Sequence, residues 1–192
     1  MTKTKSTERQ RTRILLRFSI DDIRGAISQL NPTIGHDNIH ANHLKLGSNL
    51  FIELIANIFS SFIIHNYIPT VMLKGTITPI IKDKLGDITK MDNYRPIMLS
   101  SVFLKVFEYC LLKRIGSYIS LNDRQHGFRC NYSTSTAHWV LRETILNYLS
   151  SKSEVYACFL DLSKAFDSVN HDILIEKLYD CGIPGIIVDI IN

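Results

Sequence analysis

The sequence predicts an α+β fold rich in helices. Apolar residues recur at helical spacing in several segments, whereas two short segments are rich in β-branched and aromatic residues. Asn, Gly and Pro separate these segments along the chain. With 192 residues, 45% of them apolar and 21% charged, the chain has the size and composition of a globular protein with a core.

The first predicted elements are helices. Ser19 is a suitable N-cap, and Asp21 and Asp22 are favourable in the first helical turn, so a helix is predicted from Ser19 up to Asn31-Pro32. The stretch "TIGHDNIHANHLKL" predicts a loop that leads into a helix. Residues 49–66 are apolar on nearly every side, which predicts a buried helix.

A β-hairpin is predicted next. Residues 75–83, "GTITPIIKD", have strand composition, a polar turn follows, and "YRPIM" can return as the second strand. Pro96 restricts this strand to an edge or to a position without a ladder hydrogen bond. Ser100 or Ser101 then caps a helix over 102–119.

The rest of the chain alternates loop, helix and strand. "NDRQHGFRCNYST" predicts a loop and "TSTAHWVLRETILNYL" an amphipathic helix. Residues 155–161, "VYACFLD", predict a short buried strand, and a helix over 170–179 should end near Gly182. An apolar helix begins after Pro184 and reaches the end of the sequence, which is typical of a fragment of a larger fold.

Charge is unevenly distributed along the chain. The formal net charge is +4; residues 1–18 hold six basic residues and one acidic, residues 74–114 hold eight basic and four acidic, and residues 150–192 hold three basic and seven acidic. A basic region beside an acidic one fits a polyanion bound next to a cation-dependent site, although ordinary solvated surfaces give the same pattern.

Composition also bears on the compartment. No apolar run approaches the roughly 18–20 residues of a membrane helix, and the basic start lacks a signal-peptide core. The four cysteines are widely and irregularly spaced, which favours free thiols over a disulfide framework. The sequence therefore predicts an intracellular, non-secreted protein without a membrane partner, in the nucleus or the cytoplasm.

Two sets of polar residues are candidate ligands. Asp161 ends the predicted buried strand, and its carboxylate needs a cation, a helix cap or a metal because burying it alone is costly. His36, His40 and His43 have spacings of four and three and could bind zinc, but surface or capping roles are favoured because no fourth ligand is evident.

Four stretches in order resemble one known family: "GTITPIIKD", "DNYRPIMLSSVFLKVFEYCLLKRI", "QHGFRCNYSTSTAHWVL" and "FLDLSKAFDSVNHDIL". With "AISQLNPTIGHDNIHANHLK" upstream, residues 19–185 resemble the amino-terminal half of a non-LTR (LINE-like) retrotransposon reverse transcriptase. The resemblance implies a right-hand polymerase fold with a fingers-like region (19–150) and a truncated start of the palm (151–192). The basic composition of residues 1–18 predicts a flexible arm before them.

The same resemblance implies roles for individual residues. Asp161 would be the catalytic aspartate that binds two Mg²⁺ (or Mn²⁺) ions, aided by the backbone carbonyl of Leu162, and Phe166 would exclude the 2′-hydroxyl of ribonucleotides. Lys82 and Arg95 would contact the triphosphate of the dNTP. The residues expected near the template are Gln125, Phe128 and Arg129. Read without the family, the same residues suit a helix cap, core packing and exposed basic positions.

One family motif is absent from the printed sequence. The aromatic-x-Asp-Asp turn should follow Asp161, but the adjacent aspartate pair here is Asp21-Asp22, upstream of the fingers. We therefore predict a fragment of an RNA-directed DNA polymerase that is inactive alone and requires a carboxy-terminal half, with RNA template, DNA primer and dNTP as partners. The alternatives are a catalytically dead or domesticated nucleic-acid-binding module and an unrelated helical interaction protein.

Overall fold

The computed structural model describes residues 17–192, which its contacts divide into two units. The first comprises 17–118 together with Ile175–Asn192, and the second comprises Ile119–Leu174. The mixture of helices and strands confirms the predicted α+β class. Most of the predicted basic arm lies outside the described residues, and the assignment of fingers and palm to particular ranges stays a prediction.

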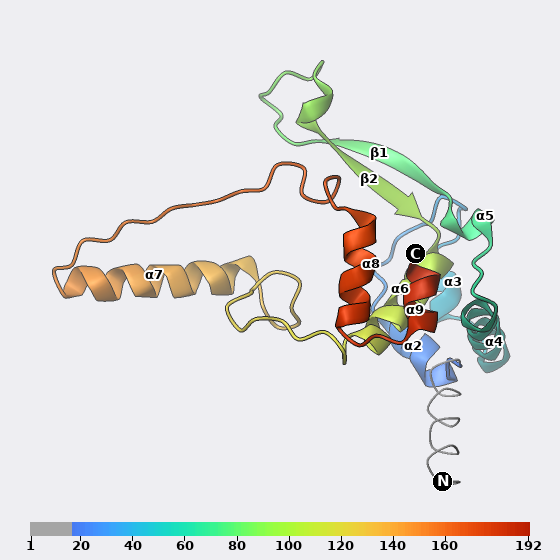
Figure 1. Cartoon of the computed structure of the whole chain (residues 1–192). Coiled ribbons are helices and arrows are strands. Elements are labelled where there is room, and N and C mark those ends of the chain that lie inside the picture. Colours follow the sequence, from blue (N-terminus) through green and yellow to red (C-terminus); the bar gives the residue numbers. More distant parts are fainter. Residues whose placement is uncertain (1–16) are drawn as a thin grey trace, which may run out of the picture. The chain divides into compact units, whose positions relative to one another are not determined.

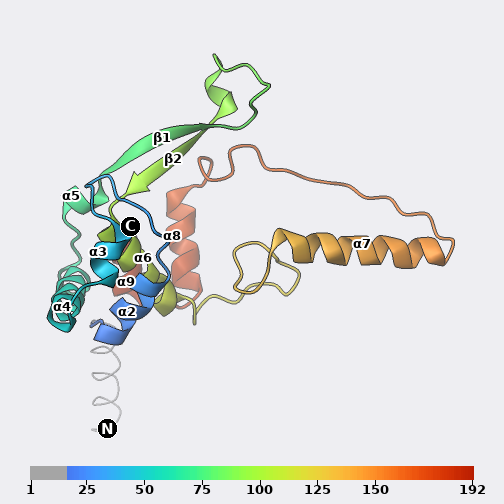
Figure 2. The same ribbon diagram turned by 180° about the vertical axis from the view of Figure 1, so that it is seen from behind.

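The first unit is mainly helical. Helix α2 lies at its centre and contacts three other helices, while α4 also contacts α9 (Figures 1 and 2). Its complete helices are α2 (Ile20–Ser28), α3 (Ala41–Lys45), α4 (Asn49–His65), α5 (Thr70–Leu73), α6 (Val102–Ile115) and α9 (Gly185–Ile191). Among the described helices, none combines the length and the apolarity needed to cross a lipid bilayer.

The core of the first unit is built on aromatic rings. The Phe107 ring centroid lies 5.1 Å from that of Phe59, 5.6 Å from Phe62 and 6.0 Å from Phe18, in edge-to-face arrangements. Phe18 is buried, and its backbone N–H donates to the Ser60 hydroxyl at 2.8 Å. Phe18, within the range predicted as an arm, is therefore part of the packed core.

Capping residues begin both central helices where the sequence predicts. Ser19 and Asp22 form a reciprocal capping box on α2: the Ser19 hydroxyl accepts from the Asp22 N–H at 3.1 Å, and the Asp22 carboxylate accepts from the Ser19 N–H at 3.1 Å. Ser101 caps α6, and its hydroxyl accepts from the Leu104 N–H at 3.3 Å. The predicted starts of both helices are confirmed.

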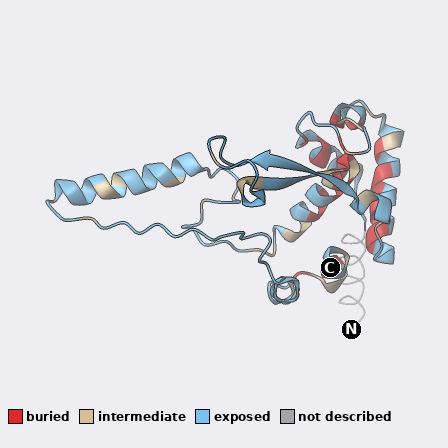
Figure 3. Cartoon of the chain, turned by 90° about the horizontal axis from the view of Figure 1, so that it is seen from above, coloured by how far each residue is buried: buried red, intermediate tan, exposed pale blue. Residues whose placement is uncertain are grey.

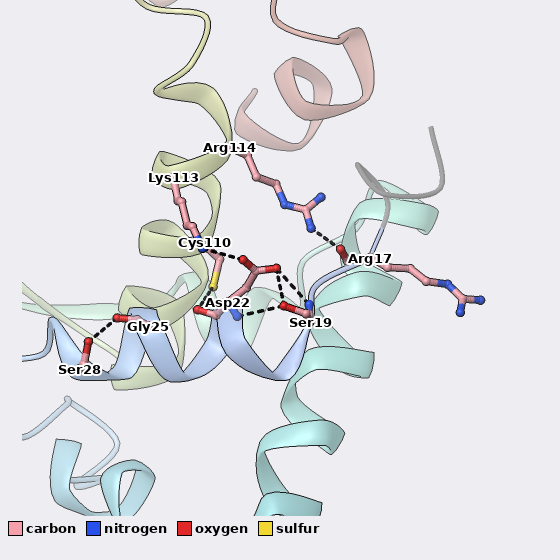
Figure 4. A network of polar contacts seen from close by, with 8 residues as sticks. All are labelled: Arg17, Ser19, Asp22, Gly25, Ser28, Cys110, Lys113 and Arg114. Atoms are coloured by element: carbon pink, nitrogen blue, oxygen red, sulfur yellow. Dashed lines mark hydrogen bonds and ion pairs between the residues drawn. The ribbon is translucent and has the colours of Figure 1, made fainter. Parts of the chain in front are cut away.

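Asp22 also joins α2 to α6 (Figure 4). The Lys113 ammonium lies 2.9 Å from its carboxylate, and the Cys110 thiol lies 3.8 Å from its backbone carbonyl. Partial burial raises the pKa of Asp22, but hydrogen bonds from Lys113 and Ser19 outweigh that effect and hold the pKa below its ordinary value. Burial, helped by the nearby Asp22 charge, raises the pKa of the Cys110 thiol to about 12, so this thiol stays protonated.

Helix α4 departs from its prediction in part. Residues 49–66 were expected to be buried on nearly every side, and Ile52, Ile55 and Phe59 are indeed buried. Leu50 and Leu54, however, are exposed on another face. Helices α2 and α9 contact α4 within the described residues and cover one side of it, which periodicity alone could not reveal because the sequence is apolar all round.

The predicted hairpin is present as an antiparallel pair. Strands β1 (Gly75–Ile81) and β2 (Tyr94–Ser100) are paired along their whole length, and the short 3₁₀ helix η1 (Met91–Asn93) precedes β2. Pro79 stands opposite Pro96 in this register. Neither residue has a backbone N–H, so the two fit a pair that exchanges no hydrogen bonds, as predicted for Pro96.

The second unit contains helix α7 (Thr134–Ser150) and the start of α8 (His171–Asp180), which continues into the first unit. None of the α7 residues is buried, as Figure 3 shows by its pale blue and tan colouring. The predicted helices are therefore confirmed, but α7 has an exposed apolar side that includes Trp139 and Leu149.

The buried strand predicted over 155–161 is wrong for this structure. These residues form no regular secondary structure, and Tyr156 and Leu160 are 88% and 93% exposed. A strand is stabilised by hydrogen bonds to a neighbour, and the sheet found in the described part of the chain contains only β1 and β2. Strand composition at 155–161 is therefore not matched by a pairing partner.

Candidate functional site

The tip of the hairpin is an ordered loop that brackets Lys82. The Lys82 backbone N–H donates to the Asn93 carbonyl at 2.8 Å, and its ammonium donates to the Asp92 carbonyl at 2.7 Å. The Asn93 side chain ties the loop together, accepting from the Asp83 N–H at 3.0 Å and donating to the Asp83 carbonyl at 2.9 Å. Lys82 therefore lies at the end of β1, where hydrogen bonds hold the backbone of the loop.

Arg95 lies on the returning strand close to this loop. It pairs with Ile80 in the register, two residues from Lys82, and its side chain is exposed. Tyr94 beside it donates through its hydroxyl to the Ile88 carbonyl at 2.9 Å, which fixes the second side of the loop. The structure thus brings Lys82 and Arg95 to the same end of the hairpin, and the exposed Arg95 guanidinium can bind an anion there.

The second unit holds the "QHGFR" loop, which is braced by its own side chains. The Gln125 amide donates to the Gly127 carbonyl at 3.0 Å, and the Arg129 guanidinium donates to the Asn122 carbonyl at 2.9 Å. The Arg129 guanidinium also lies 4.4 Å from the centre of the Tyr132 ring. The side chains of Gln125 and Arg129 therefore stabilise the loop, while their predicted position near the template is untested.

One residue of this loop meets a residue of the family motif that follows Asp161. The rings of Phe128 and Phe166 lie 6.3 Å apart at an interplanar angle of 81°, an edge-to-face contact. Both rings are otherwise open, with Phe128 90% and Phe166 79% exposed. The sequence could not predict this contact, because 37 positions separate the two phenylalanines and no pattern relates them.

Asp161 and Leu162 lie in the extended segment before Phe166. Asp161 is exposed, and it makes no hydrogen bond or ion pair with another described residue. Within residues 17–192, no group of three or more His, Cys, Asp or Glu side chains could hold a metal ion. A single carboxylate and a neighbouring carbonyl are suitable oxygen donors for Mg²⁺, but they are too few for a complete site.

The histidine cluster has a structural role. His40 caps α3 by accepting from the Asn42 N–H through Nδ1 at 3.1 Å, and His43 Nδ1 accepts from the His40 N–H at 3.2 Å. Both Nδ1 atoms are thus used in capping. Among the described residues, the three histidines are not arranged as a group that could hold a metal ion. The favoured interpretation as capping residues is confirmed for His40 and His43.

A cavity of about 630 Å³ lies in the first unit. Helices α6 and α9 and the loop that follows α2 contribute to its wall. Glu108 lines it, and burial raises the Glu108 pKa against the opposing charge of Lys105. None of the residues predicted to bind nucleotide, template or metal lines this cavity. Lys82 and Arg95 belong to the first unit, whereas Gln125, Phe128, Arg129, Asp161, Leu162 and Phe166 belong to the second.

Comparison with known proteins gives one consistent family. Residues 81–192 match the family described as reverse transcriptase (RNA-dependent DNA polymerase). The chain is 30% identical over 165 residues to a probable RNA-directed DNA polymerase from transposon BS of Drosophila melanogaster, covering 83% of this chain and 18% of the relative. It is 26% identical over 165 residues to the RNA-directed DNA polymerase from mobile element jockey of Drosophila funebris, with the same coverage of 83% and 18%.

A third relative is the retrovirus-related Pol polyprotein from a type-1 retrotransposable element R2 of Bradysia coprophila. It is 25% identical over 173 residues, which cover 90% of this chain and 19% of the relative. The chain thus spans about a fifth of the length of these relatives. The predicted resemblance is confirmed: the chain belongs to the reverse transcriptase family and matches the RNA-directed DNA polymerases of non-LTR retrotransposons.

Proposed function

We propose that this chain supplies the fingers and the first part of the palm of a right-hand RNA-directed DNA polymerase from a mobile element. The observation that carries the proposal is the single family match over residues 81–192. This match includes Lys82 and Arg95 of the hairpin and also Asp161 and Phe166. The candidate residues of both units therefore fall within one family region. The activity belongs to a longer polymerase that contains this region.

Lys82 and Arg95 bind the triphosphate of the incoming nucleotide in this proposal. Two features support it: both residues lie at one end of the hairpin, and the loop beyond them is held by Asn93 and Tyr94. Because hydrogen bonds already hold this loop, less conformational entropy is lost when a ligand binds. Arg95 offers a planar fork for two phosphate oxygens, and Lys82 adds a point charge after it exchanges the Asp92 carbonyl for a phosphate oxygen.

Asp161 supplies a catalytic carboxylate, and Leu162 a carbonyl, only as part of a larger site. Enzymes of this family use divalent metal ions, which neutralise charge during phosphoryl transfer. Within residues 17–192 the ligands for such an ion are incomplete. Further acidic residues must come from the rest of the polymerase, and the chain alone should not polymerise.

Phe166 selects deoxyribonucleotides in this proposal. A ring beneath the sugar collides with a 2′-hydroxyl but tolerates a hydrogen, so selection arises by exclusion. The exposed ring of Phe166 is compatible with contact to a ligand. Gln125, Phe128 and Arg129, from the same unit, are proposed to lie near the template strand.

The partners proposed for the complete polymerase are an RNA template, a DNA primer and dNTP. An intracellular location is part of the proposal, supported by the four free cysteines of the described chain, three of which are exposed. Binding of the nucleic acids should weaken linearly in log affinity against log salt, because phosphate contacts release counterions.

The proposal is tested with a chimaera in which residues 19–192 replace the matching segment of the jockey polymerase of Drosophila funebris. We expect the purified chimaera to incorporate labelled dNTP on a primed RNA template, and the chain alone to incorporate none. Polymerisation by the chain alone would contradict the need for further carboxylates. A folded chimaera without incorporation, beside an active jockey enzyme, would overturn the proposed function.

A further inference from the structure

Phe128 has an unusual backbone for a bulky residue. Its φ is +59°, in the left-handed region that L residues with large side chains rarely adopt. Gly127, immediately before it, has no neighbouring atom within 4 Å of the position where a Cβ would stand. The left-handed conformation is therefore adopted by the phenylalanine and not by the neighbouring glycine. This backbone conformation determines the direction in which the Phe128 ring points.

The surrounding loop fixes the backbone of Phe128 without using its ring. The Gln125 side chain donates to the Gly127 carbonyl and the Arg129 side chain donates to the Asn122 carbonyl. His126 Nδ1 lies 3.0 Å from the Thr136 hydroxyl at the start of α7. The His126 ring also packs edge-to-face on Tyr132 at 5.2 Å. The side chains of Gln125, Arg129 and His126 thus hold the loop, and the Phe128 ring takes no part in these contacts.

The Phe128 ring meets the residue proposed to select the sugar. Phe166 is 79% exposed, so little of the surrounding protein restricts its χ1 rotamer. The edge-to-face contact with Phe128, at 6.3 Å and 81°, favours the rotamer in which the two rings meet. A ring that excludes a 2′-hydroxyl must stay in one place, because each excursion to another rotamer admits a ribonucleotide.

We infer that Phe128 is a positioning residue that holds the Phe166 ring in the orientation that excludes ribonucleotides. This inference rests on the proposed function, which it deepens by adding a second residue to sugar selection. Phe128 acts through Phe166 and needs no contact of its own with the sugar. Its left-handed backbone and the loop contacts of Arg129 and His126 serve to aim its ring.

The expected effect is a loss of sugar discrimination. An edge-to-face ring pair of typical strength corresponds to a preference of about two- to tenfold for the paired rotamer. Removing the Phe128 ring should therefore raise the ratio of rNTP to dNTP incorporation by about two- to tenfold. Phe166→Ala should raise the ratio further, and Phe128→Ala should add little in its presence.

Two variants separate positioning from stability. Phe128→Gly and Phe128→Ala both remove the ring, but glycine relieves the left-handed strain whereas alanine keeps it. A merely structural residue would give two variants that differ in both stability and discrimination. A positioning residue gives two variants with different stability and the same discrimination, and Phe128→Tyr, which keeps the ring, restores the parent ratio.

The measurement uses the active chimaera, with rNTP and dNTP in direct competition. A parent chimaera without incorporation removes the proposed function and this inference with it. If the parent is active and Phe166→Ala relaxes discrimination but the Phe128 variants do not, the inference alone is overturned. Equal relaxation in Phe128→Gly and Phe128→Ala, absent from Phe128→Tyr, is the expected result.

A second readout needs no catalysis. In the full 192-residue chain labelled with 4-fluorophenylalanine, the ¹⁹F signal of Phe166 is assigned by its loss in Phe166→Leu. Ring-current effects from Phe128 should shift this signal, so Phe128→Gly should move it whereas Phe128→Tyr should not. An unchanged Phe166 signal in Phe128→Gly would show that the rings do not meet, which overturns the inference even if the chimaera polymerises.

Discussion

Replacing Asp22 with alanine should destabilise the first unit measurably. The substitution removes the reciprocal bond of the capping box and the negative charge at the start of α2. A lost cap costs about 1 kcal/mol and a lost first-turn charge about 0.3–1 kcal/mol, so the free energy of unfolding should fall by about 1–2 kcal/mol. The contact with Lys113 adds a salt-dependent contribution.

Urea unfolding followed by circular dichroism measures this loss. With a slope of about 2 kcal/mol/M, the unfolding midpoint at pH 7 should fall by about 0.5–1 M. Asp21→Asn is the matched control, because it removes a charge from the same helical turn but lies outside the network of Figure 4. Lys113→Met should lower the midpoint less than Asp22→Ala, and its effect should shrink in 1 M NaCl.

The pH dependence of this effect has a defined sign. Because the pKa of Asp22 is lower in the folded chain than in the unfolded chain, its ionised form stabilises the fold. That stabilisation is complete above the ordinary carboxyl pKa and is lost as the pH falls through the folded value. The difference between wild type and Asp22→Asn should be constant from pH 7 to 5 and should shrink below about pH 4. Equal midpoints at pH 7, or a difference that persists in strong acid, would refute the reasoning.

Three further experiments probe other parts of the fold. Phe107→Ala should lower the free energy of unfolding by about 3–5 kcal/mol and Phe107→Leu by less, because leucine fills more of the space between the rings; urea unfolding compares them, and equal losses would argue against the aromatic core. Gly182→Ala should cost about 1–2 kcal/mol because φ is +77° there, whereas Gly25→Ala inside α2 should be stabilising; thermal unfolding should give opposite shifts. Asn93→Ala should remove the hydrogen-exchange protection of the Asp83 N–H, and retained protection would mean that Asn93 does not brace the loop.

Local chemistry predicted much of the fold. Ser19 and Ser101 start helices because a hydroxyl satisfies a free N–H at the first turn, and such a signal lies within four residues. The hairpin was predictable for the same reason, since strand composition and the restriction at Pro96 are local. Gly182, at φ +77°, ends α8 close to its predicted end.

Features that depend on distant partners were not predictable. The segment 155–161 has strand composition, but composition does not supply the neighbour to which its N–H and C=O groups would bond. Phe18 was assigned to an arm because basic residues precede it, whereas its burial depends on Phe59 and Phe107. The contact of Phe128 with Phe166 likewise depends on a left-handed backbone that no sequence signal marks on a phenylalanine.

The residues of the candidate site were found by family resemblance rather than by pattern. Lys82, Arg95 and Asp161 are individually ordinary, and only the order of the surrounding motifs singles them out. The structure adds the contacts that the motifs do not encode, namely the Asn93 brace and the ring pair.

The most direct test of the polymerase assignment compares two aspartates in the chimaera. Asp161→Asn and Asp167→Asn remove the same charge from exposed positions six residues apart, and only Asp161 is assigned to catalysis. We expect Asp161→Asn to lower dNTP incorporation on a primed RNA template by at least about 100-fold and Asp167→Asn to leave it within about threefold of the parent. Equal activity of the two variants would contradict the assignment of Asp161 as the catalytic carboxylate.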